Sequence, residues 1–111
     1  MIEITSSSND RVRRVQALQR STRRRLREGL MVVEGTRLVQ ELHSSNFPIL
    51  TLFVTQDFLT DEQTNRLVQE VCDGERCAIV TEALMEAMSD TMTPQGILAV
   101  VPTPERPADP V

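Results

Sequence analysis

The segment 30-LMVVEGTRLVQEL-42 decides the fold of this chain. Its apolar run, Leu30 to Val33, stops at Glu34 and Gly35, and apolar residues then return with helical spacing at Leu38, Val39 and Leu42. A short apolar run followed by an amphipathic segment is typical of a strand that leads into a helix. The segment therefore predicts a β–α unit, in which Glu34 is either a catalytic carboxylate at the end of the strand or part of the turn.

The same alternation continues to residue 101. Further apolar runs lie at 49–54, 77–80 and 97–101, and amphipathic segments lie at 36–44, 60–71 and 82–88. Thr60 and Gln63 form a capping box at the start of the second amphipathic segment. Strands that are apolar throughout are expected when helices cover both faces of a sheet. Residues 30–101 therefore predict one α/β domain with a small, largely parallel sheet.

Residues 1–29 predict an arginine-rich helical arm before this domain. Ser8 or Asn9 is a suitable N-cap for a helix that begins near Asp10 and stops at Gly29. A helical wheel places apolar positions on one side, namely Val12, Val15, Leu18, Thr22 and Leu26. The arginines on the opposite side are Arg13, Arg20, Arg24 and Arg27. Alternatively, the modest helix formers Ser21 and Thr22 divide the arm into two shorter helices.

The charges of the chain are unevenly distributed around a net charge of −4. Residues 1–37 contain nine arginines and four acidic residues, whereas the remainder contains three arginines and twelve acidic residues. The chain has no lysine, and arginine binds phosphate groups through two parallel hydrogen bonds. This asymmetry predicts a basic arm that binds a polyanion such as nucleic acid. A compositional habit of the source genome would also explain the missing lysine.

Sequence signals for catalysis or metal binding are weak. Cys72 and Cys77 are the only cysteines, without further ligands at metal-binding spacing, so we expect packed or half-exposed thiols and neither a disulfide nor a metal site. His43 is the only histidine, and the four glycines are isolated, so neither a hydrolytic triad nor a glycine-rich phosphate loop is predicted. We expect no cofactor in this chain and no catalysis by this chain alone.

No apolar run approaches the length of a membrane span, and the N-terminus lacks the order of a secretory signal. We therefore expect a cytoplasmic protein without a membrane partner. The segment 102–111 contains Pro102, Pro104, Pro107 and Pro110, a composition that predicts an extended linker to a following domain.

Four motifs occur in a characteristic order. They are 6-SSSNDRVRRVQAL-18, Arg25 four residues before Gly29, the segment 30–42, and 88-MSDTMTPQGILAVV-101. Together they resemble the N-terminal substrate-binding domain of the SpoU family of RNA ribose methyltransferases, over residues 6–101. The resemblance implies a three-layer α/β/α sandwich like that of the kink-turn-binding ribosomal proteins, with a mixed four-stranded sheet whose last strand is antiparallel.

In that family this domain presents RNA, ribosomal RNA in our expectation, to a following knotted domain. The knotted domain uses S-adenosylmethionine to methylate a ribose 2′-hydroxyl, and its motifs are absent from residues 1–111. The positions that match family motifs are Asn9, Arg13, Arg25, Glu34, Gly35, Arg37, Thr93, Gln95 and Gly96. Asp10 stands where the family often has proline, and arginine replaces lysine in the first helix, which leaves the start of that helix uncertain but preserves phosphate affinity.

The resemblance favours a local structural role for Glu34 and Gly35 at an RNA-facing edge, where the carboxylate accepts backbone N–H groups or orients Arg37. Three functions stay open. The first is the RNA-recognition domain of a SpoU-type methyltransferase, dimeric through its missing domain although this piece alone is monomeric. The second is a freestanding RNA-binding module of the ribosomal-protein type. The third is an adaptor whose basic arm binds an acidic protein.

Overall fold

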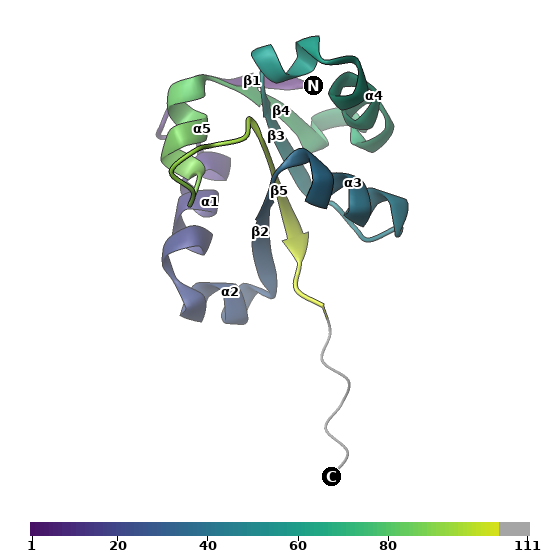
Figure 1. Cartoon of the computed structure of the whole chain (residues 1–111). Helices are drawn as coiled ribbons and strands as arrows, with labels where there is room; N and C mark the ends of the chain where they lie inside the picture. The colour runs from purple at the N-terminus through teal and green to yellow at the C-terminus, as the bar shows by residue number, and fades with distance from the viewer. Residues whose placement is uncertain (105–111) are drawn as a thin grey trace.

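The structure is a computed structural model that describes residues 1–104. Five strands form one mixed sheet in the order β1-β4-β3-β5-β2 (Figure 1). The strands are β1 Ile2–Ile4, β2 Leu30–Glu34, β3 Thr51–Thr55, β4 Cys77–Val80 and β5 Ile97–Pro102. Strands β1, β4 and β3 are parallel, and β5 lies antiparallel to both β3 and β2. Residues 105–111 of the predicted linker lie outside the described residues.

The prediction of four strands was incomplete, because the sheet has a fifth strand at its edge. Strand β1 pairs with β4 only, and Ile4 is its single fully buried residue. A strand of three residues with one buried side chain gives almost no periodic signal in a sequence. The antiparallel direction of the last strand, β5, agrees with the resemblance to the SpoU family.

Helices cover both faces of the sheet, which makes three layers (Figure 1). Helices α1 Asp10–Arg20 and α5 Glu82–Met88 pack on one face, and α3 Thr36–Ser44 and α4 Glu62–Val71 pack on the other. The fifth helix, α2 Thr22–Glu28, buries no side chain. Among the described residues, no helix combines the length and apolarity needed to cross a membrane.

Strand β5 shows why the strands are apolar throughout. Leu98 and Val100 belong to the core between the sheet and helices α1 and α5. Ile97, Ala99 and Val101 belong to the core between the sheet and helices α3 and α4. Because successive side chains of a strand point to opposite faces, both faces of this strand must be apolar. The two-sided covering predicted from the sequence is therefore confirmed.

The arginine-rich segment forms two helices, so the alternative with a break at Ser21 is correct. Ser21 has an extended backbone, and its hydroxyl accepts a hydrogen bond from the backbone N–H of Arg24 as the N-cap of α2. The break changes the direction of the chain, and Leu26, which one continuous helix would bury, is 72% exposed. The predicted helix ends are confirmed, with Asn9 as N-cap of α1 and Gly29 as the left-handed C-cap of α2.

The predicted capping box at Thr60 and Gln63 was wrong. Thr60 ends a 3₁₀ turn, Asp57–Thr60, and its hydroxyl donates a hydrogen bond to the carbonyl of Asp57. The N-cap of α4 is Asp61, whose carboxylate accepts hydrogen bonds from the N–H and the hydroxyl of Thr64, at 3.0 and 2.9 Å. These bonds lower the pKa of Asp61, because they stabilise its charged form.

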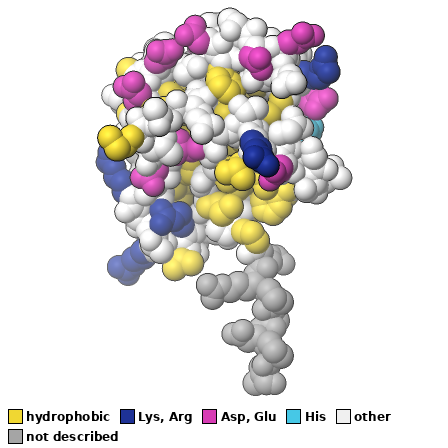
Figure 2. Space-filling model, in the orientation of Figure 1, with side chains coloured by type: hydrophobic (Ala, Val, Ile, Leu, Met, Phe, Trp, Pro, Cys, Tyr) yellow, Lys and Arg dark blue, Asp and Glu magenta, His cyan; other side chains and the backbone are white. Residues whose placement is uncertain are grey.

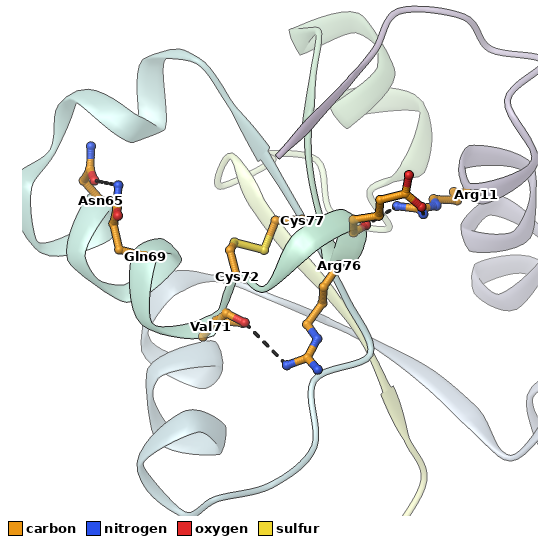
Figure 3. Close-up of a disulfide and its surroundings, with 8 residues drawn as sticks. Arg11, Asn65, Gln69, Val71, Cys72, Arg76 and Cys77 are labelled. Atoms are coloured by element: carbon orange, nitrogen blue, oxygen red, sulfur yellow. Dashed lines mark hydrogen bonds and ion pairs between the residues drawn. A yellow bond between two sulfur atoms is a disulfide. The ribbon is translucent and has the colours of Figure 1, made fainter.

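The expectation of two unpaired thiols was also wrong. Cys72, directly after α4, forms a disulfide with Cys77, the first residue of β4, and their Cα atoms lie 5.4 Å apart (Figure 3). Two cysteines are too few for the disulfide framework of a whole domain or for a zinc site, but this bond closes only one α–β connection. Cysteine spacing alone does not show that a connection brings its two ends so close.

We predict that Gly96→Ala destabilises the protein. Gly96 has a φ of 79°, and an added Cβ would lie 2.7 Å from Cδ2 of Phe58 and 3.2 Å from Oγ1 of Thr55. Gly74→Ala is the matched control, because its φ is 61° and no atom lies within 4 Å of the added Cβ. Overpacking should make the Gly96 variant about 1–3 kcal/mol less stable than the control. Urea unfolding measures the difference, and equal midpoints would contradict the predicted crowding.

We also predict that reducing the disulfide lowers the free energy of unfolding. The bond joins residues five apart in sequence, and closing so short a loop in the unfolded chain contributes about 2 kcal/mol. Urea unfolding with and without a thiol reductant measures the effect. A Cys72→Ala/Cys77→Ala variant should show no response to the reductant, and a wild-type midpoint that also ignores it would contradict the prediction.

Candidate nucleic-acid interface

The strongest candidate site is a shallow groove of about 450 Å³ along the outer side of α1, at its junction with α2. Its lining consists of Asp10, Arg13, Arg14, Ala17 and Arg24. Helix α1 buries Val12, Val15 and Leu18 against the sheet, so its arginines must lie on the solvent side. The break at Ser21 then brings Arg24 of α2 beside Arg14 of α1. The fold therefore assembles three guanidinium groups along one groove.

Two of these arginines bind the same carboxylate. Nε of Arg14 lies 3.2 Å from Oε1 of Glu28, and Nε of Arg24 donates a short hydrogen bond to Oε2 of Glu28. The bond from Arg24 is the main cause of a lowered pKa of Glu28, and Arg14 adds to it. Glu28 therefore stays ionised at neutral pH and neutralises part of the groove.

Other arginines on these helices carry uncompensated charge. Four arginine side chains form neither an ion pair nor a hydrogen bond within residues 1–104, and all four are exposed. They are Arg13, Arg20, Arg23 and Arg27. Figure 2 shows dark blue side chains at the lower left, over α1 and α2, and magenta ones along the upper rim. Eight of the nine arginines in residues 1–37 lie on α1 and α2, whereas Arg37 lies on α3 beside Glu41.

Arg25 forms hydrogen bonds at the junction of α1 and α2. Its Nη1 donates to the carbonyl oxygens of Leu18 and Gln19, and its Nη2 donates to Oγ1 of Thr22 at 2.8 Å. These carbonyls belong to the last turn of α1, where no intrahelical donor remains. Arg25 therefore caps α1 and fixes the angle between α1 and α2. Contact of Arg25 with RNA stays a prediction.

Glu34 joins three parts of the fold. Its Oε1 accepts the hydroxyl of Ser89 at 2.5 Å, and its Oε2 accepts the backbone N–H of Asp90 at 2.9 Å and Nε2 of Gln19 at 3.3 Å. The predicted backbone N–H partner is thus present, but it comes from the loop 89–96 after α5. The alternative, that Glu34 orients Arg37, is not observed, because Arg37 lies 3.7 Å from Glu41 on its own helix.

The loop 89–96 lies against the end of β2. Gly35 has a φ of 102°, and a Cβ there would lie 2.8 Å from Oε1 of Gln95. Thr93 and Gln95 are exposed, as a contact surface requires. Glu34, Gly35, Gln95 and Gly96 are therefore brought together, although about sixty residues separate the two pairs in the sequence.

The predicted site residues fall into three regions. The arginines of α1 and α2 form a basic surface, and Glu34 with Gln19 connects α1 to the loop that carries Thr93 and Gln95. Asn9 caps α1 through the N–H of Arg11. Arg37 lies in α3, on the opposite face of the sheet. It lines a second groove of about 550 Å³ with mixed charge, between α3 and α4.

Sequence reasoning missed Arg14 and Glu28 as members of the site. A single helix from residue 10 to residue 28 would keep these two residues far apart, and only the break at Ser21 brings them together. The preference of serine for N-cap positions was the available signal.

Aromatic side chains and metal ligands are not part of this surface. Phe53 is fully buried, and Phe47 and Phe58 pack on the α3–α4 side of the sheet. In the part of the chain that the structure describes, no group of His, Cys, Asp or Glu could hold a metal ion. The basic surface can therefore bind phosphate groups, but it lacks a platform on which bases stack.

Solved structures with a similar fold are RNA methyltransferases. An RNA 2′-O ribose methyltransferase has a TM-score of 0.80 at 20% identity, over 97% of this chain and 40% of its own. An rRNA methyltransferase from Sinorhizobium meliloti has a TM-score of 0.73 at 21% identity, over 94% and 38%. The SpoU methyltransferase AviRb from Streptomyces viridochromogenes, with AdoMet bound, has a TM-score of 0.72 at 25% identity, over 93% and 37%. The chain spans about two fifths of the length of these proteins.

No curated protein matches this chain significantly. The family model described as the MRM3-like substrate binding domain matches residues 9–99, which is most of the chain. This match and the shared fold confirm the resemblance to the substrate-binding domain of the SpoU family. The chain belongs to the family of MRM3-like substrate-binding domains.

Proposed function

We propose that this chain is the RNA-recognition domain of an S-adenosylmethionine-dependent 2′-O-ribose methyltransferase that acts on ribosomal RNA. The observation that carries the proposal is the surface of α1 and α2, where Arg13, Arg20, Arg23 and Arg27 have no partner among residues 1–104. Such a surface on a substrate-binding domain fits a phosphate backbone.

The proposed mechanism is binding and presentation of RNA. Arginines of α1 and α2 would contact phosphates, and Arg25 and Glu34 would hold these helices and the loop 89–96 in fixed positions. Without aromatic residues on the basic surface, affinity would depend on charge and on the shape of a structured RNA.

The remaining parts of the proposal concern the whole protein. A following domain would bind S-adenosylmethionine, carry the catalytic residues and form a homodimer. Two proteins of this fold bind AdoMet, an rRNA methyltransferase from Sinorhizobium meliloti and AviRb, which supports the cofactor. The first of them acts on rRNA, which supports ribosomal RNA as the substrate. We also propose a cytoplasmic location for the whole protein.

We predict that Arg13→Gln/Arg20→Gln weakens binding of structured RNA and lowers its salt dependence. Each arginine on a phosphate releases condensed counterions, so losing two contacts should reduce the slope of log affinity against log salt by about 1.4–1.8 units. Fluorescence anisotropy with a labelled RNA hairpin, repeated over a range of salt concentrations, measures both quantities.

Arg66→Gln/Arg76→Gln is the matched control, because it removes the same charge from α4 and from the turn before β4. It should change the slope far less. Equal slopes for the two double variants would show that α1 provides no specific contacts. Binding that survives ribonuclease treatment of a cell lysate would favour a protein partner instead.

We further predict that residues 1–111 do not bind S-adenosylmethionine. The four glycines of residues 1–111 are isolated and form no glycine-rich loop, and we assign the cofactor to a following domain. Isothermal titration of the fragment with the cofactor should give no heat of binding. A micromolar dissociation constant would contradict the assignment of functions to the two domains.

A further inference from the structure

We infer that Arg14 and Arg24 form a subsite for one phosphate of the RNA backbone, which the carboxylate of Glu28 occupies in the free protein. The inference rests on the proposed function, because it names the contact by which the basic surface would bind its substrate. It adds two residues, Arg14 and Glu28, to those expected from the sequence.

The geometry of the three side chains supports the subsite. Arg14 from α1 and Arg24 from α2 point their Nε–H groups at two different oxygens of one carboxylate. A phosphodiester likewise shares one negative charge between two oxygens on one atom, and arginine binds carboxylate and phosphate in similar geometry. The two guanidinium groups are thus held in positions where a phosphate could replace the carboxylate.

Both arginines keep unused donors in the groove. A guanidinium has five N–H groups, and within residues 1–104 each of these two side chains uses only its Nε. The side chain of Arg14 is 50% exposed and that of Arg24 is 39% exposed. Arg13 is a third cation in the same groove, and unlike the other two it has no partner in the described structure. A ligand can therefore reach the subsite from solvent.

Glu28 can be displaced at little cost. Its ion pairs with Arg14 and Arg24 lie near the surface, where the side chains of Arg14, Arg24 and Glu28 are 50%, 39% and 21% exposed, and such pairs contribute little to stability. Helix α2 buries no side chain, so the side chain of Glu28 can rotate away from the two arginines while the backbone of the last turn, which carries Arg25, stays in place. The pKa of Glu28 is lowered, so the carboxylate remains charged at neutral pH and competes with phosphate until it is displaced.

The test is binding of a labelled RNA hairpin with a fully paired stem, measured by fluorescence anisotropy at low salt. Glu28→Gln removes the competing charge and keeps both arginines, so affinity should rise about three- to tenfold. Arg14→Gln/Arg24→Gln should lower affinity about tenfold or more, because two charge-assisted contacts are lost. In that double-variant background, adding Glu28→Gln should have little further effect.

Glu62→Gln is the control, since it removes one acidic charge from another pair four residues apart, with Arg66 on α4. It should leave affinity nearly unchanged. If Glu28→Gln behaves like this control, or weakens binding, the subsite is wrong and Glu28 only positions the arginines. If thermal melting shows that Glu28→Gln is unfolded, the paired arginine variant decides, and wild-type affinity there overturns the inference. A wild-type protein that does not bind the hairpin removes the proposed function as well.

Discussion

Burial of Val12, Val15 and Leu18 against the sheet is the constraint on which the charged surface depends. Each of these side chains contributes about 1.5–3 kcal/mol when it is removed from water. Their burial fixes the rotation of α1, and that rotation leaves Arg13, Arg14 and Arg20 on the solvent side. Helix α1, which belongs to the segment predicted as an arm, therefore forms one layer of the domain together with α5.

Two polar contacts convert this packing into a defined surface. Arg25 caps the end of α1 and fixes α2 beside it, so that arginines of the two helices line one groove. Glu34 connects α1 to the loop 89–96 through Gln19 and Asp90. Neither residue needs to contact RNA to matter, because each determines where other side chains lie. Substitution of either residue would change the shape of the surface as well as its charge.

Elements with a strong local sequence pattern were predicted correctly, and features without such a pattern were missed. Apolar periodicity located α3, α5, β4 and the core strands well, because burial on two faces leaves a strong local pattern. Strand β1 was missed because three residues carry little pattern, and the disulfide was missed because its formation depends on how one connection folds. The capping of α4 was misplaced by one residue, since a 3₁₀ turn uses Thr60 for its own hydrogen bond.

The sequence by itself determined the α/β class, the concentration of arginine in the first 37 residues and the motifs of the family. Within residues 1–104, tertiary structure alone decided which arginines have no partner, which one caps a helix and which bind Glu28. The physical reason is that composition and periodicity are properties of neighbouring residues. The pairing of Arg14 with Glu28, and of Glu34 with the loop 89–96, instead depends on where the chain turns and on which elements the core brings together.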